Sequence, residues 1–179
     1  MGMGSEYLKH MDSVNETELR LLMDRYGDDV WKYAYVITRD REQARDIAQE
    51  VFIKAHYGIR SFRGQSSIKT WLLAITRNLS LNYVSSGYFR KILLFGIVKS
   101  RQAVPSAESA YMGERTAGEI WEVILCLPNK LHEVLVLDLE HELPVREIAQ
   151  LLGLPEGTVK SRLHRARKSV ESTMKGWEQ

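Results

Sequence analysis

The chain has 179 residues, of which 44% are hydrophobic and 27% charged, and its formal net charge at pH 7 is +2. This composition is typical of a soluble globular protein, and because no apolar run approaches the roughly 20 residues that a membrane-spanning helix needs, we expect no membrane anchor. Such a small net charge does not by itself indicate a nucleic-acid partner, which makes the distribution of the charges along the chain the informative feature.

The single cysteine and the N-terminal segment each support an expectation about the protein. The single Cys126 excludes an internal disulfide, and its apolar context VILCLP predicts a buried core residue in a protein of the reducing cytoplasm. Residues 1–13, MGMGSEYLKHMDS, have no clear period. We expect them to be an expression-derived or disordered N-terminus, with the native start near Met11.

From about Glu16 to Tyr83, apolar residues recur at helical spacing, which predicts successive helices without an intervening strand. We expect a break after Gly27 between the first two of these helices. Their apolar positions are Leu19, Leu22, Met23 and Tyr26 in the first helix and Val30, Trp31, Ala34 and Ile37 in the second.

The third and fourth helices are separated by the loop SFRGQSS. Asp40 is a plausible N-cap for the third, because a carboxylate at this position accepts hydrogen bonds from the free N–H groups of the first turn. The inward stripe of the third helix is Ala44, Ile47, Ala48, Val51 and Ala55. The fourth helix carries Ile68, Trp71, Leu72, Ile75, Leu79 and Tyr83 on one side, with Arg77, Asn78 and Ser80 elsewhere.

Residues 87–117 scatter Gly, Pro, Ser and Ala among charged residues, which is typical of a linker. The apolar run KILLFGIV at 91–98 is either an exposed contact surface or a segment that folds back on the N-terminal helices, and the run is too short for its period to decide. Helical periodicity then returns. We therefore expect an all-α protein of two small helical domains, 14–86 and 118–179, joined by a flexible linker.

The segment LPVREIAQLLG at 143–153 predicts a short helix that Pro144 can open and that Gly153 can end in a left-handed turn. Its apolar stripe is Ile148, Ala149, Leu151 and Leu152. The next helix begins near Pro155, which suits a first turn because its missing N–H would have no partner there. Two short helices that meet at a glycine turn are typical of a helix-turn-helix, whose second helix enters the DNA major groove; a solvated helical hairpin is the alternative.

The second of these helices has one apolar face and a cationic remainder. The apolar face is formed by Val159, Leu163, Ala166 and Val170. The opposite side carries Ser161, His164, Arg165 and Lys168, with Lys160, Arg162 and Arg167 on its flanks. This surface combines positive charge with hydrogen-bond donors, which suits a helix that both holds a polyanion and reads it.

Three segments together carry a resemblance to a known family. They are EQARDIAQEVFIKAH (42–56), SFRGQSSIKTWLLAITRNLSLNYV (61–84) and LPVREIAQLLGLPEGTVKSRLHRAR (143–167). In this order they are similar to the two conserved domains of bacterial RNA polymerase sigma factors of the extracytoplasmic function (ECF) subfamily. The resemblance implies sigma region 2 at 14–86, for core polymerase docking and promoter melting, and sigma region 4 at 118–179, for binding of the upstream promoter element.

The resemblance implies that the helix with the DxxQE motif docks on a coiled coil of the largest polymerase subunit. The residues that it assigns to this contact are Asp46, Gln49, Glu50 and Phe52. The polar three lie at i, i+3 and i+4 beside the buried stripe, which turns them outward together toward Arg or Lys on a partner. The alternative is an acidic face that is only solvated, as most exposed charges are.

The resemblance also implies that the loop before the fourth helix captures a base flipped out of the non-template promoter strand. The residues assigned to this loop and to strand contacts of the following helix are Phe62, Arg63, Gly64, Gln65, Ser66, Ser67, Lys69, Arg77, Asn78 and Asn82. A small polar loop beside an arginine can hydrogen-bond a base edge and so offset the few kcal/mol that base extrusion costs. A plain interhelical connection is the alternative, because Gly and Ser are common in loops. Trp71, on the apolar stripe, is expected in the core.

The sequence departs from the family pattern in two places. After Asn82 come Ser85 and Ser86, where many relatives carry Asp and then a run of Arg or Lys, which puts phosphate contacts at that end of the helix in doubt. Pro144 stands where a hydroxyl residue often begins the first helix of the helix-turn-helix, although a first-turn proline preserves the helix start.

In the second domain, the resemblance implies that the cationic helix reads the upstream (minus-35) promoter element. The candidate base contacts are Lys160, Ser161, His164 and Arg165, and the candidate phosphate contacts are Arg162, Arg167 and Lys168, with Thr158 on the same surface. A bidentate contact to a base edge contributes about 1–3 kcal/mol of discrimination, whereas a phosphate contact sets position without sequence.

The sequence therefore predicts an alternative sigma factor that binds core RNA polymerase and promoter DNA, has no metal, cofactor or catalytic activity of its own, and, by resemblance, is masked by an anti-sigma factor. The alternative is a helix-turn-helix regulator that acts without polymerase, which would need neither the DIAQEVF face nor the FRGQSS loop. An enzyme is not favoured, because the five His show no metal-ligand spacing and no phosphate-cradling glycine loop is present.

Overall fold

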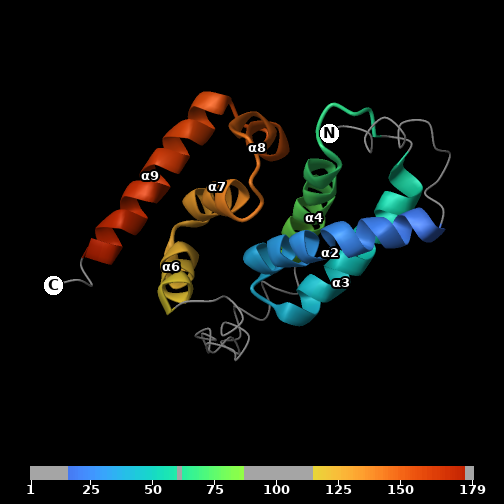
Figure 1. The fold of residues 1–179 in the computed structure, drawn as a ribbon, viewed down its shortest axis with the longest axis horizontal. Helices are drawn as coiled ribbons and strands as arrows, with labels where there is room; N and C mark the ends of the chain where they lie inside the picture. Colours follow the sequence, from blue (N-terminus) through green and yellow to red (C-terminus); the bar gives the residue numbers. More distant parts are fainter. Residues whose placement is uncertain (1–15, 60–61, 87–114, 176–179) are drawn as a thin grey trace. The chain divides into compact units, whose positions relative to one another are not determined.

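The computed structural model describes residues 16–59, 62–86 and 115–175. In these ranges the chain forms seven α-helices and no strand, as the predicted all-α class requires (Figure 1). The chain divides after Ser86 into two compact units, and each unit is described by itself. Expectations for three segments lie wholly or almost wholly outside the described residues: 1–13, the apolar run 91–98 and the linker 87–117.

The first unit contains α2 (Glu16–Thr38), α3 (Arg41–Gly58) and α4 (Ile68–Ser85). Each of these helices packs against the other two. Their shared core encloses aliphatic side chains from all three, among them Val30, Val51 and Leu72, which are fully buried. Removal of this apolar surface from water, at about 25 cal/mol per Å², is the main force that holds the three helices together.

α2 is one continuous helix, and the predicted break at Gly27 is therefore wrong. Leu22 and Val30, on either side of the glycine, belong to the same core. Packing both onto α3 and α4 outweighs the cost of about 1 kcal/mol that a helical glycine carries relative to alanine. Met23, which was predicted to line this helix, is 44% exposed, and the fully buried residues of α2 are Val30, Tyr33 and Ala34.

The start of α3 confirms the predicted N-cap. Asp40 Oδ1 accepts hydrogen bonds from the backbone N–H groups of Glu42 and Gln43, at 3.0 and 3.2 Å. These bonds satisfy two of the four N–H groups that a helix start leaves without intrahelical partners. The predicted inward stripe of α3 is also confirmed, since four of its five members are buried and Ala48 is partly buried.

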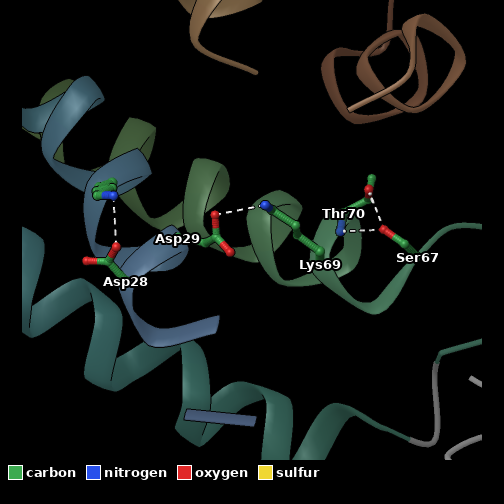
Figure 2. A network of polar contacts seen from close by, with 6 residues as sticks. Asp28, Asp29, Ser67, Lys69 and Thr70 are labelled. Carbon is green, nitrogen blue, oxygen red and sulfur yellow. Dashed lines mark hydrogen bonds and ion pairs between the residues drawn. The ribbon is translucent and has the colours of Figure 1, made fainter. Parts of the chain in front are cut away.

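α4 begins after Ser67, whose Oγ accepts the N–H of Thr70 at 3.1 Å and lies 2.8 Å from the Thr70 hydroxyl (Figure 2). The helix buries more of its surface than its apolar stripe predicts. Ser80, expected on the polar side, is fully buried, and so is Thr76, whose hydroxyl donates to the Leu72 carbonyl at 2.8 Å. The bond to the preceding turn satisfies the Thr76 hydroxyl, whereas the Ser80 hydroxyl is buried with no hydrogen-bond partner among the described residues. Apolar periodicity detects neither of these buried hydroxyl residues.

The second unit contains α6 (Arg115–Cys126), α7 (Asn129–Leu139), α8 (Val145–Leu152) and α9 (Glu156–Lys175). α7 packs against the other three helices, and α9 also contacts α6 and α8. Cys126, which was expected in the core, is exposed. The end of α6 buries Ile124 and Leu127 instead, and a residue two positions after Ile124 points to the other side of the helix.

α8 and α9 meet at Gly153, as a helix-turn-helix requires. Gly153 is left-handed, with φ 65° and ψ 38°, and the N–H of Leu154 donates to the Ala149 carbonyl at 2.9 Å, which closes the end of α8. Pro144 and Pro155 each stand one residue before the first helical residue, not in the first turn as predicted. The helix starts are otherwise where the sequence places them.

We expect Gly153→Ala and Gly157→Ala to change stability in opposite directions. A Cβ at either position would meet nothing within 4 Å, and only the backbone conformation therefore differs. The left-handed conformation at Gly153 costs an L-residue about 1–2 kcal/mol, whereas alanine gains up to about 1 kcal/mol over glycine inside a helix such as α9. Urea unfolding followed by circular dichroism measures both changes, and destabilisation by both variants would contradict this account of the turn.

Candidate functional site

The outward face of α3 lies opposite its buried stripe, and Asp46, Gln49 and Glu50 are all exposed on it. Two apolar side chains continue the same face toward the end of the helix: Ile53 is 57% exposed and Tyr57 is 76% exposed. At about 100° per residue, positions i, i+4, i+7 and i+11 from Asp46 fall in one row. This apolar continuation of the exposed face was not predicted, although Ile53 and Tyr57 both lie outside the predicted buried stripe.

Glu50 has a partner on its own helix. Its carboxylate lies 3.4 Å from the Lys54 ammonium, and both side chains are about half exposed. An exposed ion pair at i, i+4 contributes only about 0.3–0.5 kcal/mol. Glu50 can therefore exchange Lys54 for a cation on a partner at little cost.

Phe52 does not lie on this face. It is 4% exposed and belongs to the core of the first unit. A residue two positions after Glu50 is turned to the far side of the helix. The structure thus corrects the assignment of Phe52 to a direct partner contact: the ring fixes α3 from beneath.

The loop between α3 and α4 is supported by a buried aromatic contact. Phe62 is 5% exposed, its backbone N–H donates to the Ile59 carbonyl at 2.9 Å, and its ring centroid lies 5.5 Å from that of Trp71. Trp71 packs against the core, as predicted. The Phe62 ring is therefore buried beneath the loop and is not presented to a base. This burial corrects the assignment of Phe62 to a direct DNA contact.

The exposed side chains of this loop are Arg63 and Gln65. Gly64 between them has φ 67°, a conformation that glycine adopts without strain. The two serines that follow are partly buried and use their hydroxyl groups locally: Ser66 donates to the Ser67 carbonyl at 3.2 Å, and Ser67 caps α4. Arg63 and Gln65 are thus the loop members best placed to meet a ligand.

Lys69, predicted to contact DNA, is engaged within the first unit. Its Nζ lies 2.9 Å from Oδ1 of Asp29 on α2, and the two side chains are only 25% and 23% exposed. Figure 2 shows Lys69 reaching from the first turn of α4 toward α2, with the Ser67–Thr70 cap beside it. The neighbouring Asp28 pairs with Lys32 at 2.8 Å. The α2–α4 pair could not be predicted from local sequence patterns, because its two members are far apart in the chain.

Farther along α4, Asn78 and Asn82 are exposed and Arg77 is partly buried. The two asparagines are four residues apart and therefore share one side of the helix. Their amides can donate to and accept from the edge of a base or a phosphate.

α9 has the two faces that its sequence predicts. Val159, Leu163 and Ala166 are buried against the second unit. The predicted DNA-binding residues divide into exposed Lys160, Ser161, His164, Arg165, Arg167 and Lys168 and partly buried Thr158 and Arg162. Rotation of the helix about its axis is therefore fixed by burial of one face, and the cationic face is turned to solvent.

Several polar groups of this face have partners on α9 itself. The Ser161 hydroxyl donates to the Thr158 carbonyl at 2.9 Å, and Arg165 Nε donates to the Ser161 carbonyl at 3.3 Å. The Arg165 guanidinium keeps further N–H groups for a ligand, because it carries five donors. The serine oxygen likewise keeps acceptor capacity.

Arg167 makes a contact that the sequence did not suggest. Its Nη2 lies 2.6 Å from Oδ2 of Asp138 on α7. Arg167 remains mostly exposed, while Asp138 is largely covered. Of the predicted phosphate contacts, Arg167 thus already forms an ion pair with α7 in the free protein.

The described residues contain neither a metal-ligand cluster nor a membrane-spanning helix. No group of three or more His, Cys, Asp and Glu side chains in residues 16–59, 62–86 and 115–175 could hold a metal ion. No helix in the same part of the chain is both long and apolar enough to span a bilayer.

Comparison with known proteins matches both units. Residues 22–88 match the family model for sigma-70 region 2, and residues 117–170 match the model for sigma-70 region 4. The chain is 32% identical over 171 residues to the RNA polymerase sigma factor YlaC of Bacillus subtilis, covering 93% of this chain and 95% of that one. It is 30% identical over 165 residues to the ECF RNA polymerase sigma factor SigW of the same organism, covering 86% and 87% of the two chains.

Solved structures share the fold at lower identity. The sigma factor RpoE of Bartonella quintana, in complex with the anti-sigma factor NepR, has a TM-score of 0.74 at 21% identity, over 89% of this chain and 98% of that one. CnrH, in complex with the cytosolic domain of CnrY, has a TM-score of 0.66 at 18% identity, over 96% and 95%. The two matched regions in order, with relatives of 30–32% identity over most of both chains, place this protein: it belongs to the ECF family of RNA polymerase sigma factors.

Proposed function

We propose that this sigma factor divides promoter-specific initiation among three surfaces: α3 docks core RNA polymerase, the loop before α4 and the helix itself melt the minus-10 element, and α9 reads the minus-35 element. The observation that carries the proposal is the opposite character of the exposed faces in the two units. Asp46 and Glu50 project from α3, while Lys160, Arg165 and Lys168 project from α9. One face suits a basic protein surface and the other suits DNA.

Docking through α3 rests on its exposed ridge. Carboxylates at Asp46 and Glu50, with the Gln49 amide between them, can accept hydrogen bonds from Arg or Lys of the polymerase. The partner surface should then become apolar toward Ile53 and Tyr57, because these large side chains are left exposed in the free protein. The core beneath this exposed face, which includes Phe52, holds the helix in place, so docking costs little conformational entropy.

Promoter melting is proposed for the loop and for α4. Arg63 and Gln65 are exposed on a loop whose base is fixed by Phe62 and Trp71. A rigid loop of this kind can hold a flipped base by hydrogen bonds to its edge, which must offset an extrusion cost of a few kcal/mol. The exposed Asn78 and Asn82 could then contact the separated strand.

Readout of the upstream element is proposed for the exposed face of α9. Lys160, Ser161, His164 and Arg165 are the candidate base contacts, and the first turns of a recognition helix are where base edges come within reach. Lys168 and Arg167 are the candidate phosphate contacts. Arg167 must share its guanidinium with Asp138 or leave it.

The partners follow from this function. Core RNA polymerase and promoter DNA are the two required partners, and nucleotide addition belongs to the polymerase, because a sigma factor is a regulatory subunit. The complex of the sigma factor RpoE with the anti-sigma factor NepR supports an anti-sigma factor as a third partner of this chain. We place the protein in the cytoplasm, with polymerase.

We expect the combined Asp46→Ala, Gln49→Ala and Glu50→Ala variant to weaken binding to bacterial core polymerase at least 10-fold, because three exposed polar contacts are removed without touching the core. Run-off transcription from a candidate promoter should fall accordingly. Fluorescence anisotropy of the labelled sigma factor, titrated with core enzyme, measures the affinity.

The control for this variant is Asp24→Ala, which removes an exposed carboxylate from α2. It should bind core polymerase as the wild type does. Wild-type affinity of the triple variant would refute docking through α3. Tight promoter binding by the wild type without polymerase would instead favour a regulator that acts alone.

Arg165→Ala and Lys168→Ala should separate base readout from phosphate contact. The first should cost about 1–3 kcal/mol on the cognate promoter and relax discrimination at one base pair, whereas the second should weaken all sequences alike and reduce the salt slope of binding by about 1. Holoenzyme binding to promoter duplexes with single base-pair changes, at several salt concentrations, tests both. A uniform loss for Arg165→Ala would move it to the phosphate contacts.

A further inference from the structure

The ion pair between Lys69 and Asp29 stands out because a lysine at the start of a helix has the wrong sign. Lys69 is the second residue of α4, where the helix dipole presents its positive end. An ammonium group there is disfavoured unless a negative charge offsets it. Asp29 supplies that charge at 2.9 Å, and its carboxylate is itself favoured near the start of α4.

Both members of the pair are held by their neighbours in the chain. Asp29 precedes Val30, which is fully buried, and Lys69 lies between Ile68 and Thr70, which are 6% and 2% exposed. With side chains only 23% and 25% exposed, the pair is less accessible to water and salt than a surface pair, so its attraction is less screened. The pair therefore joins two side chains whose backbones are held in place by buried neighbours on α2 and α4.

The pair also lies at the point where the loop joins α4. Ser67, the last loop residue, caps the helix through Thr70, one residue beyond Lys69 (Figure 2). The Phe62–Trp71 contact fixes the other end of the loop. Asp29 thus contacts the first turn of α4, directly after the loop, from α2, a helix to which no promoter contact has been assigned.

We propose that Asp29 is a positioning residue for promoter melting: through Lys69 it holds the start of α4 and the loop 62–67 against α2, and Lys69 serves this ion pair instead of contacting DNA. The inference rests on the proposed melting role of the loop. The exposed side chains near Lys69, Arg63 above all, then make the contacts with the separated strand.

Charge reversal distinguishes a positioning pair from a DNA contact. Asp29→Lys and Lys69→Asp each place like charges together and should reduce open-complex formation on duplex promoter about 10-fold. The double variant Asp29→Lys, Lys69→Asp restores opposite charges and should return to within about threefold of the wild type. Fluorescence of 2-aminopurine in the minus-10 element, in the full holoenzyme, reports opening.

Three further measurements separate a melting defect from a docking defect and from a folding defect. Core polymerase affinity should be unchanged in all variants, and a template with a preformed bubble should relieve most of the defect of the single variants. The matched control is the swap Asp28→Lys, Lys32→Asp, which exchanges the adjacent i, i+4 pair on α2 and should leave opening unaltered. Urea unfolding checks that each variant is folded.

The outcomes are distinct. If the double variant is no less defective than Lys69→Asp, restored opposite charges do not rescue opening and the inference is overturned. If Asp29→Lys also opens the promoter normally, Lys69 contacts DNA. If the control swap is as defective as the single reversals, the effect is general electrostatics and the inference also fails. If the wild type forms no open complex with core polymerase, the proposed function itself fails.

Discussion

Burial of one face on each exposed helix is the constraint on which the rest of this molecule depends. In α3 the buried stripe that includes Ile47 and Val51 leaves Asp46 and Glu50 no direction but outward. In α9, burial of Val159 and Leu163 likewise turns the cationic side of the helix to solvent. The free energy that orients these functional side chains is thus hydrophobic, although the side chains themselves are polar.

Polar contacts between helices then adjust what the hydrophobic packing has set. Asp29 with Lys69, and Asp138 with Arg167, each join a helix with a proposed DNA contact to a helix without one. In both pairs a cation that could bind a phosphate is already matched by a carboxylate. The basic residues of the two units are therefore not equivalent: Arg63, Arg165 and Lys168 are exposed, whereas Lys69 is committed to the fold.

The exposed face of α3 and the loop before α4 are kept available to a ligand in different ways. In α3, Glu50 makes only an exposed ion pair with Lys54, and Ile53 and Tyr57 are exposed to water, so the proposed docking surface is accessible in the free protein. The described part of the loop before α4, residues 62–67, has an aromatic contact at Phe62 and a helix cap at Ser67. These two contacts limit the conformations open to Arg63 and Gln65 between them, which lowers the entropic cost of the proposed contact with a flipped base.

Apolar spacing and capping chemistry in the sequence were enough to determine the helices, the Asp40 cap, the Gly153 turn and the two faces of α9, because all of these depend on residues within a few positions of one another. The helix-turn-helix followed from the same local patterns, whereas the family was indicated by the resemblance of three segments to ECF sigma factors. Tertiary structure alone decided the continuity of α2 through Gly27, the burial of Phe52, Phe62 and Ser80, and the exposure of Cys126. It also decided the partners of Lys69 and Arg167, because a salt bridge between helices depends on how distant segments pack, and local periodicity holds no record of that.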